Sequence, residues 1–206
     1  LDEEYVVRQF SWTLRAGVVA DDNTLNVLVH LPTYERMRHE NPQRLWESDI
    51  PRFDRWVVDG STTEVDAAAY AVQRVTADRR YSTFAEISNV LAFVQSIHYS
   101  LDEHTTPAED YWRYPIETMH DETGDCEDTT ILAAAVLRRL GHRVGTMFMP
   151  GHAALAVEAP PGTPGHFIVH NGRHMYYCET TAAGWRVGEL PRSMEGVNPT
   201  LVMLPA

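Results

Sequence analysis

A cysteine lies at the point where a strongly predicted helix begins. The sequence GDCED at residues 124–128 runs directly into a segment rich in Ala and Leu that ends at Gly141. A helix N-terminus carries unpaired backbone N–H groups and about half a positive charge, so it favours the anionic form of a thiol. We therefore predict that Cys126 is a nucleophile.

Two further residues complete the set that a thiol nucleophile needs, a base and a group that orients the base. His152 follows a Pro-Gly turn and opens an apolar run, and Glu179 ends another apolar run. The spacing leaves room for one helix and one strand between Cys126 and His152, and for one hairpin between His152 and Glu179. Each residue alone has an ordinary structural explanation, whereas acyl transfer requires all three. The sequence therefore predicts a triad of Cys126, His152 and Glu179.

The segments around these residues resemble a known family. GDCED at 124–128, PGHAALAVE at 150–158 and YYCETT at 176–181 resemble the transglutaminase-like cysteine peptidases and amidases, in particular their microbial branch. The resemblance spans about residues 114–191. It implies a papain-like α+β fold in which the cysteine begins a helix, the histidine lies on the next strand and an acidic residue on the strand after. The family usually carries Asp at this last position, where the chain has Glu179.

The oxyanion hole has weaker signals in the sequence. The backbone N–H of Cys126 is the default donor, and Trp112 or Tyr114, just upstream, are candidates for a second. This chemistry requires no cofactor.

Acidic residues surround the cysteine in the sequence. Asp125, Glu127 and Asp128 lie next to Cys126. Glu127 and Asp128 have a plain explanation, because acids in the first turn complement the helix dipole. They also raise the pKa of the Cys126 thiol, so a protonated His152 is needed to offset them. Acid clusters of this kind in similar bacterial periplasmic proteases imply a second role. Carboxylate oxygens suit a hard cation, and the three acids are a candidate calcium site.

The N-terminal part is predicted to be a β-hairpin. Residues 10–15 alternate between apolar and polar, the ADDN sequence at 20–23 predicts a turn, and residues 25–31 predict a second strand that Pro32 ends. Residues 33–60 are expected to be an irregular connection with at most a short helix.

Helices are predicted to follow the N-terminal extension. Capping-box patterns at 61–64 and 83–86 open two helices, the first of which runs to about residue 78. The segment 101–123 is expected to be a long loop that forms one wall of the cleft. The Cys126 helix comes next.

The C-terminal part changes to a strand pattern. We expect strands at 144–149, 152–158, 166–170, 174–179 and 201–204, with the Asn-Gly pair at 171–172 as a hairpin turn. Helices followed by an antiparallel sheet predict an α+β fold, in which the cysteine-bearing helix packs on the sheet.

The predicted elements divide into two parts of one compact unit. Residues 1–60 form the hairpin and irregular extension, and residues 61–206 form the transglutaminase-like core. Cys178 should face away from Glu179, because neighbours on a strand point to opposite faces. We therefore expect two free thiols and no disulfide.

The charge of the chain limits its partners. The formal net charge is −12, and all 17 basic residues are Arg. Such an acidic, lysine-free surface predicts a halophilic source, because salt screens charges over about 3 Å at 1 M. The alternative is a GC-rich genome that favours Arg codons, which explains the missing Lys but not the surplus of Asp and Glu. No basic stripe is available for nucleic acid. No apolar run approaches the roughly 20 residues that a membrane helix needs.

These observations predict an enzyme. We expect a cysteine-dependent hydrolase or acyl transferase that cleaves amide bonds of a protein or peptide through a thioester acyl-enzyme. The alternative is a non-catalytic peptide-binding module of a larger membrane or cell-surface protein. The chain begins with Leu1, so we expect a processed product or a piece of a longer protein with additional domains. An extracytoplasmic or cell-surface location in a halophilic microbe is the expectation for its setting.

Overall fold

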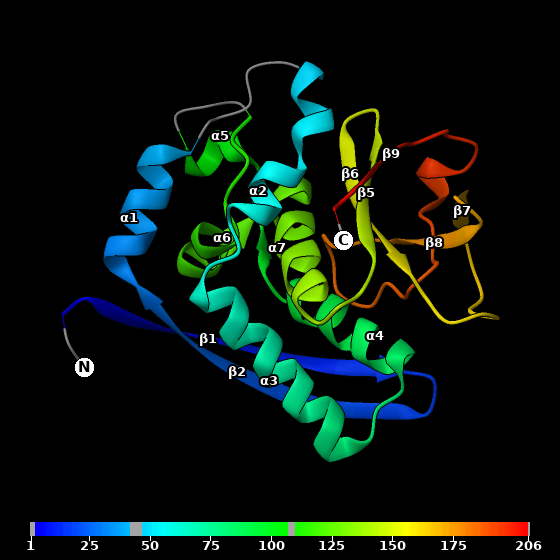
Figure 1. Ribbon diagram of the computed structural model, residues 1–206, viewed down its shortest axis with the longest axis horizontal. Helices are drawn as coiled ribbons and strands as arrows, with labels where there is room; N and C mark the ends of the chain where they lie inside the picture. The colour runs from blue at the N-terminus through cyan, green and yellow to red at the C-terminus, as the bar shows by residue number, and fades with distance from the viewer. Residues whose placement is uncertain (1–2, 42–46, 107–109, 206) are drawn as a thin grey trace.

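The computed structural model describes residues 3–41, 47–106 and 110–205, and Figure 1 shows its arrangement. The helices are α1 (Leu31–Glu40), the 3₁₀-helix η1 (Glu47–Arg52), α2 (Asp54–Val58), α3 (Thr63–Arg79), α4 (Thr83–Val94), α5 (Asp102–Thr105), α6 (Pro115–Asp121), α7 (Cys126–Arg139) and the 3₁₀-helix η2 (Arg192–Met194). The strands are β1 (Tyr5–Ala16), β2 (Val19–His30), β3 (His98–Tyr99), β4 (Thr123–Gly124), β5 (Val144–Met149), β6 (His152–Glu158), β7 (Phe167–His170), β8 (Arg173–Cys178) and β9 (Thr200–Met203).

Helix α7 lies at the centre of the molecule, between the sheet on one side and α6 and α1 on the other (Figure 1). Asp125 is its N-cap, and a capping box joins Asp125 to Asp128. Gly124 is required just before the cap, because a Cβ there would lie 2.7 Å from the Asp128 Cβ. Nearly the whole helix is buried, so the position of Cys126 is fixed by packing on every side.

An antiparallel sheet with strand order β7-β8-β6-β5-β9 packs against α7. Positive φ angles at Asn171 and Gly172 form the predicted turn between β7 and β8. Successive side chains along each strand point to opposite faces of the sheet. Cys178 faces the core around α7, whereas Tyr177 faces a second apolar cluster on the other side. Both cysteines are free, as predicted.

The N-terminal hairpin is longer than predicted, and its turn lies elsewhere. β1 and β2 pair along their whole length, from Tyr5 opposite His30 to Ala16 opposite Val19. The chain reverses at Gly17 and Val18, with Gly17 at φ 61°, as two-residue hairpin turns with a leading Gly require. The predicted turn at 20–23 is therefore wrong, because these residues lie on β2 and pair with β1.

The connecting segments are more helical than predicted. Residues 33–60, expected to be irregular, contain most of α1 and also η1 and α2, while their part at 42–46 lies outside the described residues. Pro32 ends the strand but also occupies the first turn of α1, where its missing N–H costs nothing. Residues 101–123, expected to be a loop, contain α5 and α6.

Two helix caps also differ from prediction. Thr62 caps α3 without a side-chain hydrogen bond, and the Glu64 carboxylate accepts the backbone N–H of His30 instead of closing a capping box. The cap of α4 is Ser82, one residue earlier than predicted, and its hydroxyl accepts the Ala85 N–H at 3.2 Å.

The predicted fold class is confirmed. The chain has an α+β core in which the Cys-bearing helix packs on an antiparallel sheet, with an N-terminal β-hairpin. One apolar core joins the hairpin, through residues such as Phe10 and Val27, to α4 and α7. Phe10 meets Phe93 edge-on, with 5.3 Å between ring centroids. No helix in the ranges that the structure describes is long and apolar enough to cross a membrane.

Candidate active site

His152 and Glu179 meet at one end of the sheet. His152 opens β6, Glu179 follows β8 directly, and these strands are hydrogen-bonded neighbours. His152 Nε2 lies 2.9 Å from Glu179 Oε2, and both side chains are largely buried. A carboxylate that accepts the Nε2 proton holds the imidazole in the tautomer that carries its lone pair on Nδ1. His152 is thereby prepared to act as a base through Nδ1.

The Glu179 carboxylate accepts hydrogen bonds from several other groups. Oε1 accepts the Thr181 hydroxyl at 2.7 Å and the backbone N–H groups of Thr180 and Thr181 at 3.0 and 3.1 Å. Oε2 also accepts the Tyr177 hydroxyl at 2.7 Å. Burial alone would raise the pKa of Glu179, but hydrogen bonds from His152, Thr181 and Tyr177 outweigh it and lower the pKa to about 2. Glu179 is therefore an anion at neutral pH.

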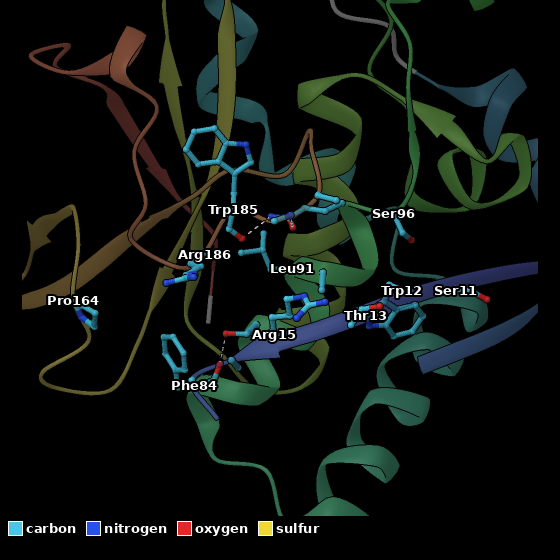
Figure 2. A pocket seen from close by; sticks show the side chains of 17 residues that line it. Ser11, Trp12, Thr13, Arg15, Phe84, Leu91, Ser96, Pro164, Trp185 and Arg186 are labelled. Atoms are coloured by element: carbon cyan, nitrogen blue, oxygen red, sulfur yellow. Dashed lines mark hydrogen bonds between the residues drawn. The ribbon is translucent and has the colours of Figure 1, made fainter. Parts of the chain in front are cut away.

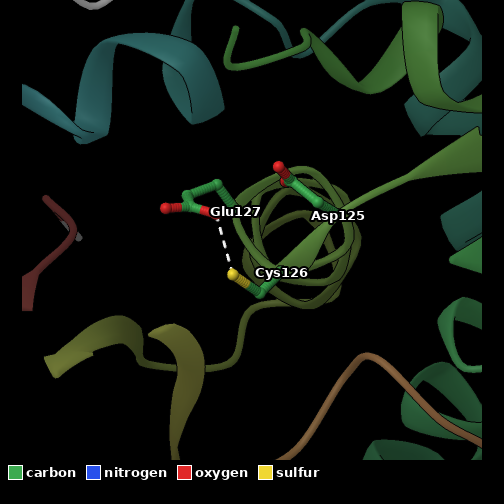
Figure 3. Close-up of side chains that lie close together, drawn as sticks. All are labelled: Asp125, Cys126 and Glu127. Atoms are coloured by element: carbon green, nitrogen blue, oxygen red, sulfur yellow. Dashed lines mark hydrogen bonds between the residues drawn. The ribbon is translucent and has the colours of Figure 1, made fainter. Parts of the chain in front are cut away.

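The Cys126 thiol lies at the start of α7, close to the start of β6. Its Sγ donates to Glu127 Oε2 at 2.8 Å, as Figure 3 shows. The backbone N–H of Ala153, the residue after His152, points at the sulfur. Burial, followed by the charges of Glu127 and Asp125, raises the pKa of Cys126, and the Ala153 N–H opposes this. Among the described residues, the structure forms no hydrogen bond between Cys126 and His152.

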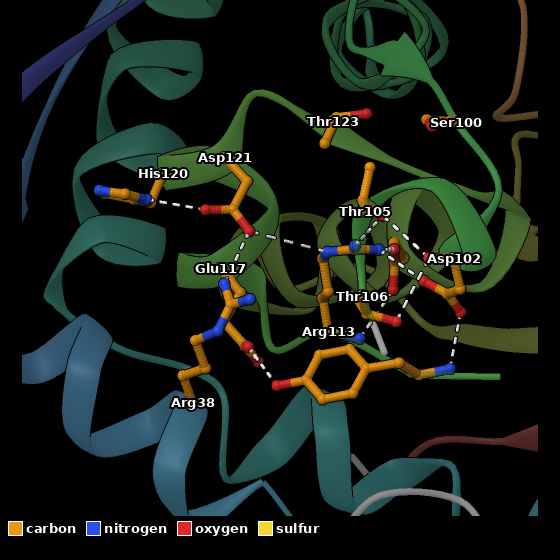
Figure 4. A network of polar contacts seen from close by, with 12 residues as sticks. Arg38, Ser100, Asp102, Thr105, Thr106, Arg113, Glu117, His120, Asp121 and Thr123 are labelled. Atoms are coloured by element: carbon orange, nitrogen blue, oxygen red, sulfur yellow. Dashed lines mark hydrogen bonds and ion pairs between the residues drawn. The ribbon is translucent and has the colours of Figure 1, made fainter. Parts of the chain in front are cut away.

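A buried arginine organises the acids beside the first turn of α7. Arg113 forms an ion pair with Asp102 at 2.8 Å and approaches Asp121 at 3.9 Å (Figure 4). It also forms an ion pair with Asp128. Its backbone N–H also donates to Asp128 at 2.7 Å. The side chains of Arg113, Asp102 and Asp128 are almost fully buried, so this network anchors the segment before α6 to the start of α7.

The arginine leaves negative charge uncompensated. Carboxylate oxygens of Asp102, Asp125 and Asp128 lie within 4.8 Å of one another, and Arg113 supplies one positive charge against them. Burial, together with the charges of Asp128 and Glu127, raises the pKa of Asp125.

The donor set fits a hard cation such as calcium. Two groups of closely spaced side chains share Asp125: one contains Cys126 and Glu127, and the other contains Asp102 and Asp128. The Asp128 oxygens already accept from Arg113 and from the Asp125 N–H at 3.2 Å, so Asp125 and Glu127 are the less engaged ligands.

The two residues predicted to assist the oxyanion hole differ in position. The Tyr114 backbone N–H donates to Glu117 Oε2 at 2.9 Å and is therefore already engaged. Trp112 is buried, stacks on Phe148 with ring centroids 5.8 Å apart, and directly precedes Arg113. The Cys126 N–H is at the first position of α7, where no acceptor exists within the helix.

Besides Arg113 and Asp102, sequence reasoning missed three further residues around the site. Tyr177 binds Glu179, and its position two residues earlier on the same strand face was a usable signal. Gln95 holds the chain after β8, and Tyr99 lies near the thiol because β3 pairs with β4. Burial and the charges of Cys126 and Asp125 raise the pKa of Tyr99 to about 12. No local pattern identifies these last two residues, since their contacts are set by tertiary structure.

No protein-family model and no curated protein matches the chain. It is similar to the structure of Legionella pneumophila LapG, with a TM-score of 0.43 and 17% identity over 73% of this chain and 81% of that one. For the EGTA-treated form of that protein, the TM-score is 0.44 and the identity is 16%, over 76% of this chain and 86% of that one. A calcium-bound form of it is also among the similar structures. For a Cytophaga hutchinsonii protein, described as a candidate cysteine protease, the TM-score is 0.41 and the identity is 13%, over 90% of this chain and 65% of that one. Identity is low throughout, so the chemistry of the site rests on the geometry of Cys126, His152 and Glu179.

Proposed function

We propose that this protein is a cysteine-dependent hydrolase of peptide or amide bonds, with Cys126 as nucleophile, His152 as base and Glu179 as the orienting group. The observation that carries the proposal is the 2.9 Å contact between His152 Nε2 and Glu179 Oε2, next to a cysteine at a helix N-terminus. A histidine held by a buried anion and a thiol at the start of a buried helix have no shared structural purpose, whereas acyl transfer uses both.

The reaction follows from these positions. His152 Nδ1 takes the proton of the Cys126 thiol, and the sulfur forms a bond to the carbonyl carbon of the substrate. The backbone N–H of Cys126 donates to the developing oxyanion. The C–N bond then breaks as His152 returns the proton to the leaving amine, which leaves a thioester. Water, deprotonated by His152, attacks the thioester carbonyl. The C–S bond then breaks and His152 returns the proton to the Cys126 sulfur, while Glu179 stabilises the imidazolium in both halves.

Calcium is part of the proposal because the acids beside Cys126 oppose thiolate formation. Asp125 and Glu127, with Asp128, would hold the ion. When bound, calcium would supply positive charge that offsets these carboxylates and so lowers the pKa of Cys126. Glu127 accepts a hydrogen bond from the Cys126 thiol, with 2.8 Å between Sγ and Oε2. With calcium bound, this carboxylate would no longer favour the protonated sulfur.

One observation favours the alternative of a non-catalytic peptide-binding module. The thiol donates to Glu127 rather than to His152, and its pKa is raised. In that alternative, the cleft binds a peptide and Cys126 remains protonated. We favour the hydrolase because Glu179 and its hydrogen bonds maintain a buried, charged partner for His152 that peptide binding does not require.

Incubation with a mixture of peptides, followed by mass spectrometry of new termini, tests the function. We expect the wild-type protein with calcium to produce new termini and the Cys126→Ala variant to produce none. Incorporation of oxygen from H₂¹⁸O into the new carboxylates identifies water as the acceptor, whereas added amines in the products indicate transamidation. Identical peptide patterns for wild type and Cys126→Ala would contradict the proposal.

A further inference from the structure

A large cavity lies between β1, α4 and the segment that follows β8. Its volume is about 850 Å³, within the range of roughly 300–1,000 Å³ that is typical of ligand pockets. Side chains from β1, α4 and the segment 183–186 after β8 line it (Figure 2). The reaction described above gives this cavity no role.

The charge of the cavity is opposite to that of the chain. Arg15 and Arg186 line it, and none of the described Asp or Glu residues does, although the chain has a net charge of −12. Both arginines are exposed, and neither forms an ion pair within the described ranges. By contrast, Arg79 and Arg139 are also partly exposed and pair with aspartates. The nearby Glu189 accepts the backbone N–H of Arg186 at 3.1 Å and is not part of the lining.

The rest of the lining offers apolar surface. Trp12, Phe84 and Trp185 contribute aromatic rings, and Leu91 contributes an aliphatic side chain. Trp12 is fixed by a hydrogen bond from Nε1 to Asn89 Oδ1 at 2.8 Å, so its ring is held in place. Fixed aromatic surface next to unpaired guanidinium groups matches a ligand that combines an apolar side chain with a carboxylate.

One buried side chain joins this cavity to Glu179. Gln95 lines the cavity, and its Nε2 donates to the carbonyl oxygens of Glu179 at 2.8 Å and Trp185 at 3.0 Å. Its Oε1 accepts the Gly184 N–H at 3.2 Å. The segment that forms one wall of the cavity is therefore the direct continuation of the residue that binds His152. Gln95 thus connects the wall of the cavity directly to the backbone of Glu179.

We propose that this cavity between β1, α4 and residues 183–186 binds a segment of the peptide substrate in which acidic side chains flank an apolar one. This inference rests on the proposed hydrolase function. A surface with a net charge of −12 repels an acidic chain. The acid-free lining with Arg15 and Arg186 offsets that repulsion locally and gives the acidic segment a preferred register.

Binding to the inactive Cys126→Ala variant tests the proposal without requiring turnover. The probes are three fluorescein-labelled ten-residue peptides, identical except for two Asp, two Asn or two Lys residues around one Phe. Fluorescence anisotropy at one fixed salt concentration gives the dissociation constants. We expect the Asp peptide to bind about tenfold more tightly than the Asn peptide, as a few charge pairs allow, and the Lys peptide most weakly.

Charge reversal supplies the matched comparison. Arg15→Glu combined with Arg186→Glu should weaken the Asp peptide about tenfold or more and strengthen the Lys peptide. Arg36→Glu combined with Arg74→Glu changes the net charge equally on exposed faces of α1 and α3 and should change binding less than about twofold. Circular dichroism verifies that all variants are folded.

The outcomes separate this inference from the hydrolase function. Equal binding of the Asp and Asn peptides, or equal losses in the two double variants, overturns the inference whether or not peptides are cleaved. Tightest binding of the Lys peptide overturns it as well. Acid-selective binding that only the cavity variant loses supports the assignment of the cavity. If Cys126 then proves inert, the hydrolase function fails while the acid-selective peptide site stands.

Discussion

Tyr177 and Glu179 are joined by a 2.7 Å hydrogen bond between the tyrosine hydroxyl and Oε2, the oxygen that also lies 2.9 Å from His152 Nε2. The hydroxyl itself lies 3.4 Å from the same nitrogen. Tyr177 is almost fully buried and belongs to the face of the sheet opposite α7. The carboxylate that orients the candidate base is thus itself positioned by a side chain on the face of the sheet that points away from α7.

Replacement of Tyr177 by Phe should lower kcat about tenfold with little change in KM. A hydrogen bond to a charged group contributes about 1.5–3 kcal/mol, and part of it positions Glu179. The lost donor should also raise the pKa of Glu179. A depressed pKa stabilises the fold above the ordinary value of about 4.3 and loses this effect as pH falls towards about 2. Acid unfolding of Tyr177→Phe should therefore begin at higher pH.

The control for this change is Tyr176→Phe, since Tyr176 is equally buried but packs in the core on the other face. It should leave kcat unchanged, and it should not change how the urea midpoint of unfolding falls as the pH is lowered. Equal effects of the two substitutions would show that Tyr177 acts only through packing.

Glu179 itself gives a sharper contrast between two substitutions. Glu179→Gln should keep the fold but lower turnover by about 10³- to 10⁴-fold, because the amide stabilises the wrong tautomer and removes the charge that supports imidazolium. Glu179→Asp should be milder, since it keeps the charge and shortens the reach. The matched control is Glu158→Gln, because Glu158 pairs with Arg143 and Arg173 near the surface. Steady-state kinetics that change less than about threefold in both Glu179 variants would remove this residue from the triad.

Much of this arrangement is visible in the sequence because its signals are local. The helix that begins at Cys126, the Asn171-Gly172 turn and the strands β5 and β6 each depend on signals from neighbouring residues, and all were predicted. The chain order of Cys126, His152 and Glu179 then indicated which ends of these elements meet. Side-chain contacts made by near neighbours on one strand, such as Tyr177 with Glu179, were within reach of the same reasoning.

The missed features depend on tertiary contacts or on ambiguous residues. Pro32 is equally suited to ending a strand and to opening a helix, so the sequence did not reveal α1. The polar run at 20–23 resembles a turn but lies on β2, because Gly17 allows an earlier reversal. Gln95 reaches the site across more than 80 residues of sequence, and no local pattern encodes that contact.

Arg113 should be essential for stability. Arg113→Met removes the positive charge between the buried Asp102 and Asp128 and leaves both without their ion pair. Removing one partner of a buried ion pair typically costs about 3–5 kcal/mol, so the urea midpoint should fall strongly. Arg139→Met is the control, because its pair with Asp66 is exposed and contributes at most about 1 kcal/mol. A similar, small loss in the two variants would show that the Arg113 network does not anchor α7.

Calcium and Glu127 should act on the same thiol. Without calcium, Glu127→Gln should increase the rate of Cys126 alkylation, because it removes a charge that raises the thiol pKa. Calcium should accelerate alkylation of the wild type by about tenfold, and EGTA should reverse this. Below the pKa of the thiol, lowering that pKa by one unit raises the thiolate fraction about tenfold. The Glu127→Gln variant should respond much less. Wild-type rates that are unchanged by calcium and EGTA would contradict the calcium site, and a slower Glu127→Gln variant would contradict the proposed effect of this carboxylate.

The most direct test of the central claim is the pH dependence of Cys126 alkylation by iodoacetamide, followed by mass spectrometry in saturating calcium, for wild type and His152→Ala. Cys178 is fully buried and serves as the internal reference. If His152 and Cys126 form the nucleophilic pair, the apparent pKa of the wild-type thiol should lie below the ordinary value of about 8.5 and rise by about one unit or more in His152→Ala. Identical profiles for the two proteins, with an apparent pKa at or above about 8.5, would contradict the account.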